Sequence, residues 1–191
     1  MMTSPLHFEQ PWKVRDRFLD LHSRWMTLIG EHLQDSQGNL LEYWRIEKAD
    51  SVIVLPIQED SPAAPKGKHI LLPAPSYRPG IGQVTLDLPG GRLMQGQTPE
   101  EGAIAILKRE LGIEADAIVQ LKPLNVKGWA INSSFSDQKL YGFVAHIQGE
   151  VASSNLIAQT YPASPVGVHQ LLQELSCLQC RAVLLEWVML L

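Results

Sequence analysis

Apolar positions in the first half of the chain fall into short segments that predict β-strands. Val14–Leu21, Arg24–Leu33 and Leu40–Lys48 are expected to be strands, and Asp35–Asn39 is a polar turn between the last two. Together they predict a hairpin-like sheet at the N-terminus. The segment Ser51–Ile57, SVIVLPI, is a continuous apolar run, which is typical of a buried central strand.

The clearest helix signal lies in the middle of the chain. Thr98 precedes Pro99, and Glu101 follows the threonine by three residues, which is the pattern of a capping box with proline at the first helical position. The helix is expected to run from Pro99 to about Leu111. Gly112 then supplies a left-handed stop.

Further elements are expected on both sides of this helix, from apolar runs and start signals. They are a loose N-terminus up to Gln10, strands at His69–Leu72, Ala117–Val126 and Lys139–Ile147, a linker from Val151 to Pro165, a helix starting at Pro165 with Leu171, Leu172 and Leu175 on its apolar face, and a helix over Arg181–Leu190.

Length and charge limit the classes of protein that fit. The chain has 191 residues, which suits one domain with a small appendage, and we place the division at residues 1–48 and 49–191. Its net charge of −4 disfavours nonspecific binding to nucleic acid. The apolar run near the C-terminus is too short to span a membrane and contains Glu186, and the N-terminus lacks a secretory pattern. We therefore expect a cytoplasmic protein with no membrane or nucleic-acid partner.

The segment from Pro89 to Asp116, PGGRLMQGQTPEEGAIAILKRELGIEAD, carries a resemblance to a known family. It resembles the Nudix box, the signature of the Nudix hydrolases, written G-x5-E-x7-R-E-U-x-E-E-x-G-U with U aliphatic. The matching positions are Gly91, Leu107, Glu110, Gly112 and Ile113. The departures are Gln97 for the first glutamate, Ala105 and Ile106 for the arginine–glutamate pair, and Arg109 for the first glutamate of the final pair.

These departures bear on metal binding. Positions 106, 109 and 110 are spaced i, i+3, i+4 and share one helix face. The resemblance implies that in an active box this face carries carboxylates that hold Mg²⁺, together with a backbone carbonyl at the position of Gly90. Here the face carries Ile106, Arg109 and Glu110, which is a poor set of ligands for a cation that prefers oxygen. Glu110 is the one box acid that remains, and therefore the one candidate catalytic residue.

Arg109 has two interpretations. In the first, it is a fixed positive charge that holds a phosphate group where the family keeps magnesium. In the second, it has no such role and is either paired with Glu110 or another nearby acid, or simply exposed.

Two further segments resemble the ADP-ribose pyrophosphatase branch of the family. Tyr77–Gly80 and Leu86–Gly91 match its entry to the box, and the resemblance implies that Arg78 contacts substrate phosphate. Phe135–Asp137 match a loop that supplies an acid or base in related enzymes, which makes Asp137 a candidate binding residue, but Gln138 replaces the expected glutamate. Trp25 in the N-terminal sheet is a candidate for stacking on adenine, with core or dimer packing as the alternative.

Cys177 and Cys180 form a CLQC motif. Such a motif is a redox pair or half of a zinc site in some proteins. Its flanks here look helical, whereas redox pairs usually lie at a helix start next to a strand, and no second pair completes a zinc site. We therefore interpret both as buried structural thiols.

The resemblance implies an α/β fold, a Nudix-type α/β/α sandwich with a mixed sheet and an extra N-terminal antiparallel sheet. The function that we expect is binding of a nucleotide-like small molecule, with weak or no hydrolysis because the box is eroded. One alternative is an active hydrolase that uses Mg²⁺ with relocated acids, Glu110, Glu101 or Asp137. Another is a structural module that dimerises. The apolar N-terminal sheet and the resemblance both lead us to expect a homodimer.

Overall fold

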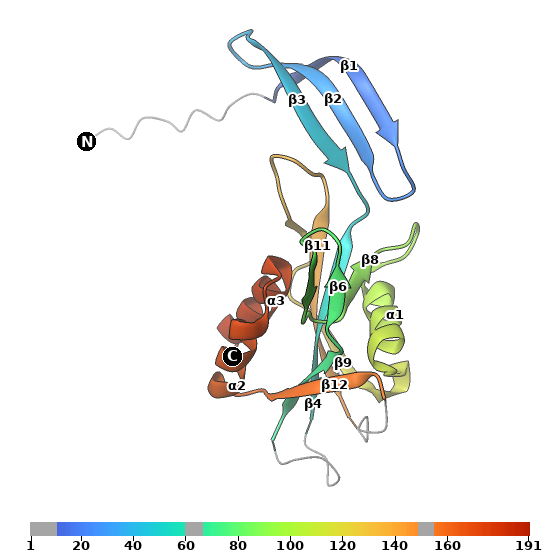
Figure 1. Ribbon diagram of the computed structural model, residues 1–191, viewed down its shortest axis with the longest axis vertical. Coiled ribbons are helices and arrows are strands. Elements are labelled where there is room, and N and C mark those ends of the chain that lie inside the picture. The colour runs from blue at the N-terminus through green and yellow to red at the C-terminus, as the bar shows by residue number, and fades with distance from the viewer. Residues whose placement is uncertain (1–10, 60–66, 149–154) are drawn as a thin grey trace, which may run out of the picture. The chain divides into compact units, whose positions relative to one another are not determined.

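The computed structural model describes residues 11–59, 67–148 and 155–191 (Figure 1). The expected loose segment up to Gln10 and the first part of the expected linker lie outside these ranges. The chain groups into two compact units. One comprises the residues up to Ala49 together with Asn132–Gln138, and the other comprises Asp50–Ile131 and Lys139–Leu191.

The first unit contains an antiparallel three-stranded sheet of β1 (Lys13–His22), β2 (Thr27–Gln34) and β3 (Leu40–Glu47), in that order. All three strands were predicted, but the second begins later than the expected Arg24. Ser23 closes a turn there, because its Oγ accepts from the backbone N–H groups of Trp25 and Met26. Trp25 therefore lies in a turn and not in a strand.

A buried carboxylate on the central strand links all three strands of this sheet. The side chain of Glu31 in β2 is 2% exposed and pairs with Arg17 of β1 and Arg45 of β3. The hydrogen bond from Arg45, together with its charge and that of Arg17, lowers the pKa of Glu31. The three side chains thus tie all three strands together through charge-assisted hydrogen bonds.

Aromatic side chains gather on the same sheet. The ring of Phe18 packs edge-on against Trp44, with 5.4 Å between ring centroids, and lies 4.9 Å from the ring of His32. Gly30 makes this possible, because a Cβ there would lie 2.4 Å from Cε2 of Phe18. Phe18 and Trp44 nevertheless remain 42% exposed.

The second unit is built on a seven-stranded mixed sheet. Its main strands run in the order β10 (Trp129–Ala130), β11 (Lys139–Ile147), β4 (Ser51–Gln58), β5 (His69–Pro73) and β12 (Ile157–Pro162), while β8 (Gly90–Arg92) pairs with β4 and β9 (Ile118–Pro123) pairs with β11. The pairing of β4 with β11 is parallel, whereas the other pairings are antiparallel.

The continuous apolar run of β4 is explained by helices on both faces of the sheet (Figure 1). Ile53, Leu55 and Ile57 point to a core shared with α2 (Pro165–Glu174) and α3 (Leu178–Met189). The alternate residues Val52 and Val54 point to a second core shared with α1 (Pro99–Leu111). A strand covered on both faces needs no polar side, and the predicted α/β/α sandwich with a mixed sheet is confirmed.

Helix α1 has the predicted bounds and both predicted caps. Thr98 Oγ1 accepts from the backbone N–H of Glu101, whose carboxylate accepts from the N–H of Thr98. Gly112 ends the helix with φ 66°. Ala103 and Leu107 are fully buried, as expected, and Ile106 is only 2% exposed.

The linker expected from Val151 to Pro165 was wrong over residues 157–162. Ile157–Pro162 forms strand β12, which pairs with β5 at the edge of the sheet. Its Ile157, Gln159 and Tyr161 are half-buried and alternate with exposed residues. The strand ends at Pro162, and a strand at the edge of a sheet tolerates proline. A small hairpin of β6 (Ser76–Arg78) and β7 (Gln83–Thr85) was also not predicted.

The CLQC motif was predicted to lie between two helices, one starting at Pro165 and one over Arg181–Leu190, and the structure has two helices there, the second starting earlier than expected. Helix α2 ends at Glu174, and α3 begins at Leu178 with Cys177 as its N-cap residue. The guanidinium of Arg181 donates to the carbonyl groups of Leu172 and Leu175 and so satisfies the open end of α2. In the part of the chain that the structure describes, no helix has the length and apolar character needed to cross a membrane.

Candidate functional site

Three residues of the box-like segment meet where β8 approaches α1. Nη2 of Arg109 lies 2.6 Å from Oε1 of Glu110 and donates to the carbonyl oxygen of Gly90 at 3.1 Å. The other carboxylate oxygen of Glu110, Oε2, accepts from the backbone N–H of Gly90 at 3.1 Å. The guanidinium therefore bridges the carbonyl and the carboxylate that the family resemblance assigns to a metal ion.

The surroundings of this triad are shaped to accept the arginine. A Cβ on Gly91 would lie 2.9 Å from Nη2 of Arg109 and 3.5 Å from Cγ1 of Ile106. Gly91 thus leaves the space that the guanidinium fills. Ile106 lies beside it but belongs to the core under α1, so of the three positions on this helix face only those of Arg109 and Glu110 carry polar groups toward the site.

This arrangement does not fit a magnesium ion. Magnesium takes about six oxygen ligands in an octahedral shell. Both oxygens of Glu110 already accept hydrogen bonds, and the Gly90 carbonyl accepts from Arg109. A cation placed among these oxygens would have to displace a guanidinium that already supplies a positive charge there.

The two relocated acids considered above, and the two glutamines that stand where acids were expected, make structural hydrogen bonds. Glu101 accepts in the capping box, and Gln97, which replaces the first glutamate, accepts from the N–H of Met94 through Oε1. In the first unit, Oδ1 of Asp137 accepts from the N–H of Lys48, and the buried Gln138 donates to the carbonyl of Ala49. Gln97 and Glu101 thus hold local structure around the start of α1, whereas Asp137 and Gln138 tie their segment to the chain after β3.

Arg78 forms the second charged feature of the site. Its Nε donates to Oδ2 of Asp87 at 2.6 Å, and the hydroxyl of Thr85 donates to the same oxygen at 2.9 Å. Asp87 is 8% exposed, whereas the side chain of Arg78 is 51% exposed. The carboxylate therefore holds the base of the arginine and leaves most of its guanidinium accessible to a ligand.

Two neighbouring cavities of the second unit share this ion pair. The larger, of about 490 Å³, is lined by Arg78, Asp87, Gly90, Gly91 and Arg92 among others. The smaller, of about 350 Å³, also contains Arg78 and Asp87 and reaches Glu110. The lining of the larger cavity brings two arginines, on β6 and β8, together with the glycines beside Arg109. That combination suits an anion.

The predicted binding residues fall in both units. Arg78, Arg109, Glu110 and Gly90 lie in the second unit, around the two cavities and the triad. Trp25 and Asp137 belong to the first unit. Trp25 is 53% exposed, and the guanidinium carbon of Arg24 lies 4.6 Å from its ring centroid. The predicted role of Trp25 in stacking stays a prediction.

The cysteines were not expected in a site. Cys177 and Cys180 both line the larger cavity, as does Arg78. Of the two, Cys180 is buried as predicted, but Cys177 is half-buried. The break between α2 and α3 brings them there, and the one available sequence signal was Arg181, whose side chain ends α2.

No protein-family model matches the chain, and no curated protein matches it at a significant level. Its structure is similar to a solved structure described as an ADP compounds hydrolase, with a TM-score of 0.73 over 95% of this chain and 94% of that chain. The two sequences are 21% identical. This likeness supports the Nudix-type fold described above.

Proposed function

We propose that this protein binds an ADP-type compound through its phosphate groups and does not hydrolyse it with magnesium. One observation carries the proposal, namely that the guanidinium of Arg109 bridges the Gly90 carbonyl and Glu110. A permanent cation then stands where a hydrolase of the resembling family would bind a metal. The similarity in fold to an ADP compounds hydrolase supports the choice of ligand class.

The cationic groups around the larger cavity supply what a phosphate needs. Arg78 is held at one edge by buried Asp87, and Arg92 lines the same cavity. An arginine presents several N–H donors in a fixed plane and binds phosphate oxygens in pairs. The cavity volume, about 490 Å³, is within the range of small-molecule sites.

Loss of hydrolysis follows from the same geometry. In metal-assisted hydrolysis, the ion polarises the phosphoryl group and generates the attacking hydroxide. The triad contains one carboxylate, and that carboxylate is neutralised by the adjacent arginine. A phosphate bound here would be held by cations without a group poised to activate water.

The test is calorimetric titration of the protein with ADP-ribose, ADP-glucose and ADP, in EDTA and again in magnesium, with chromatography of the products. We expect binding of at least one compound, with dissociation constants in the two conditions that agree within about twofold. We also expect no release of AMP above the background rate. Arg78→Ala should weaken binding by about tenfold or more, which corresponds to about 1.4 kcal/mol.

Arg78→Lys is the second variant, because it keeps a charge beside Asp87 but loses the planar set of donors. Lys108→Ala is the matched control, since Lys108 is an exposed cation of α1 that pairs with Glu114 away from the triad. Magnesium-dependent hydrolysis by the unmodified chain, abolished by Glu110→Gln, would overturn the proposal in favour of an active hydrolase. Absence of binding by all three compounds would favour a structural module.

A further inference from the structure

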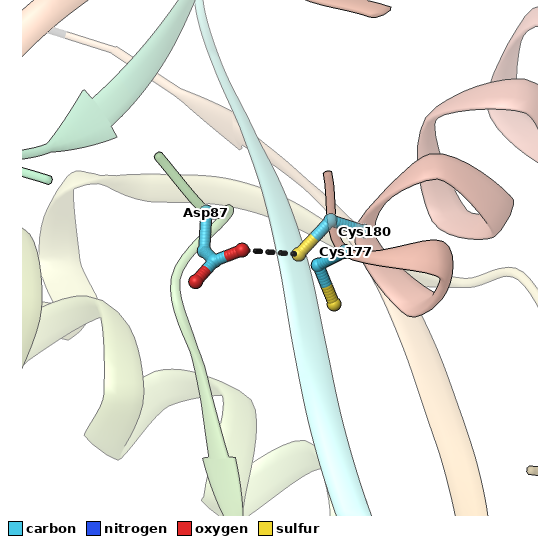
Figure 2. Close-up of side chains that lie close together, drawn as sticks. All are labelled: Asp87, Cys177 and Cys180. Atoms are coloured by element: carbon cyan, nitrogen blue, oxygen red, sulfur yellow. Dashed lines mark hydrogen bonds between the residues drawn. The ribbon is translucent and has the colours of Figure 1, made fainter. Parts of the chain in front are cut away.

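Two cysteines and one carboxylate form a compact cluster in the second unit (Figure 2). The Sγ atoms of Cys177 and Cys180 and a carboxylate oxygen of Asp87 all lie within 4.8 Å of one another. Cys177 is the N-cap residue of α3, and Cys180 lies on the first turn of that helix. Asp87 reaches the cluster from the segment between β7 and β8, far away in the sequence.

The two thiols differ in accessibility. Cys177 is half-buried, and Cys180 is 2% exposed, although both contribute to the lining of the larger cavity. A reagent in the cavity would therefore meet Cys177 first. The chain contains only two cysteines, so no third thiol competes with this order.

The electrostatic surroundings of the two thiols also favour Cys177 as the more reactive one. The thiol of Cys180 and the backbone N–H groups of Cys180 and Gln179 stabilise the Cys177 thiolate and lower the pKa of Cys177 to about 6. The hydrogen bond to Cys177 and burial raise the pKa of Cys180. A thiolate at a helix N-terminus is the usual attacking group in cysteine exchange chemistry.

Asp87 is placed to act on the buried thiol. Figure 2 shows Sγ of Cys180 directed at Oδ1 of Asp87, at 3.9 Å. Oδ2 of the same carboxylate is held by Arg78 and Thr85. Arg181, the nearest cation along α3, is turned to the carbonyls that end α2. Asp87 therefore faces the pair as the acceptor for the proton of Cys180.

We propose that Cys177 and Cys180 are a redox-active dithiol, which a low-molecular-weight disulfide oxidises reversibly to an internal disulfide. Local helix chemistry does not explain a cysteine at the N-cap, where serine, threonine, aspartate and asparagine are favoured. A pair of sulfur atoms in one helical turn, one accessible and one buried beside a carboxylate, is what exchange chemistry requires.

The reaction has two steps. The Cys177 thiolate, its proton already lost to solvent, attacks one sulfur of the disulfide RSSR, so that the S–S bond breaks and RS⁻ leaves and takes a proton from water. Asp87 then accepts the proton of Cys180, whose thiolate attacks the Cys177 sulfur. The second RS⁻ leaves with that proton. Two electrons pass from the dithiol to RSSR, which yields the Cys177–Cys180 disulfide and two RSH.

The test uses the intact protein and oxidised glutathione at pH 7, with acid quenching, alkylation of remaining thiols and mass spectrometry. We expect a product that is two hydrogen masses lighter and takes up no alkylating agent, and a peptide that links Cys177 to Cys180. Excess reduced glutathione should restore both thiols. This outcome does not depend on ligand binding, so the inference stands or fails separately from the proposed function.

Variants separate the roles of the residues. Cys180→Ala should stop at a stable glutathione adduct on Cys177. Cys177→Ala should react at least about tenfold more slowly than Cys180→Ala, because its remaining thiol is buried. Asp87→Asn should slow the second step, conversion of adduct to internal disulfide, by about tenfold or more.

Three results would overturn the inference. One is a wild-type protein that accumulates only the mixed disulfide. Another is reaction of the two single-cysteine variants at equal rates. The third is stoichiometric zinc in the purified chain, released when the thiols are modified, since the cluster would then be a metal site.

Discussion

Arg109 and Glu110, neighbours along α1, form an ion pair with 2.6 Å between Nη2 and Oε1. Consecutive helical residues do not normally face each other. They meet here because both side chains bind the backbone of one residue, Gly90: Arg109 donates to its carbonyl, and Glu110 accepts from its N–H. The geometry of the pair is thus set by the start of β8 as much as by the helix.

Gly91→Ala tests this geometry without altering a charge. A Cβ at this position would lie 2.9 Å from Nη2 of Arg109, and the backbone conformation of Gly91 does not require glycine. We expect the new methyl group to displace the guanidinium and weaken binding of the ADP-type ligand about as much as Arg109→Ala does, roughly tenfold. Calorimetric titration measures both, with Lys108→Ala as the control.

The fold should survive Gly91→Ala, because the displaced atoms are the end of a flexible, 58% exposed side chain. A melting temperature within about 2 °C of the wild type is expected, since surface changes of this kind cost under about 0.5 kcal/mol. Ligand binding unchanged in Gly91→Ala but weakened in Arg109→Ala would show that the contact with Gly91 is not needed.

Ile106→Glu should destabilise the protein instead of restoring a metal ligand. Ile106 is 2% exposed and packs in the core under α1. A carboxylate there is expected to cost about 3 kcal/mol or more, whereas the control Ile106→Val should cost about 1 kcal/mol. Urea unfolding followed by circular dichroism measures the difference. An Ile106→Glu protein of wild-type stability would contradict the buried position of this side chain.

Alkylation of Cys177 should depend on pH with a midpoint near 6, the value to which its surroundings lower the pKa. Because the thiolate is the reactive form, the rate should stay near its maximum above this pH and fall below it. In Cys180→Ala the midpoint should move upward, since the largest cause of the shift is the hydrogen bond from Cys180. The measurement is the rate of iodoacetamide labelling of the Cys177 peptide as a function of pH, in the wild type and in Cys180→Ala.

Glu31→Gln should remove an acid-sensitive part of the stability of the N-terminal sheet. The folded pKa of Glu31 lies below its ordinary value of 4.5, so its contribution is complete above about that pH and is lost as pH falls through the folded pKa. Hydrogen exchange of β2 peptides should rise on acidification in the wild type. In Glu31→Gln, exchange should be faster at pH 7 and change less below pH 4.5.

We propose that the exposed aromatic face of the N-terminal sheet pairs two copies of the chain. Phe18 on β1 and Trp44 on β3, the two outer strands of the sheet, are each 42% exposed, and exposed apolar faces of this kind mark interfaces. Light scattering at micromolar concentration should give about twice the chain mass of 21.3 kDa. Trp44→Ser should lower the measured mass toward that of one chain. Met94→Ser, which changes an exposed apolar side chain of the other unit, should leave the mass unchanged.

Elements whose stability is local were predictable from the sequence. The bounds of α1 follow from Thr98, Glu101 and Gly112, which act within a few residues of one another. The burial of β4 follows from an apolar run with no polar face. In both cases the information that determines the structure lies inside the element itself.

Elements that depend on distant partners were not predictable from the sequence. Strand β12 exists because its backbone pairs with β5, and its half-buried alternation is too weak to recognise alone. The end of α2 is satisfied by Arg181 of the next helix, which donates to the carbonyls of Leu172 and Leu175. The sequence therefore predicted a linker in place of β12, and a start at Arg181 rather than Leu178 for the last helix.

The candidate site divides in the same way. The loss of box acids was visible from residue spacing, and the pairing of Arg109 with Glu110 was one of the alternatives considered. The hydrogen bond from Arg109 to Gly90 joins residues 19 positions apart and needed the fold. The approach of Asp87 to Cys180, 93 positions apart, had no sequence signal at all.

The parallel pairing of β4 with β11 sets the order in which the chain can fold. Ser51 lies opposite Leu140, so the centre of the sheet closes only after the chain as far as β11 is available. The N-terminal sheet, by contrast, joins strands that are adjacent in sequence. Local pairings form faster than distant ones. During synthesis, β4 therefore leaves the ribosome with one edge unpaired, and a chain truncated before Lys139 should aggregate through that edge.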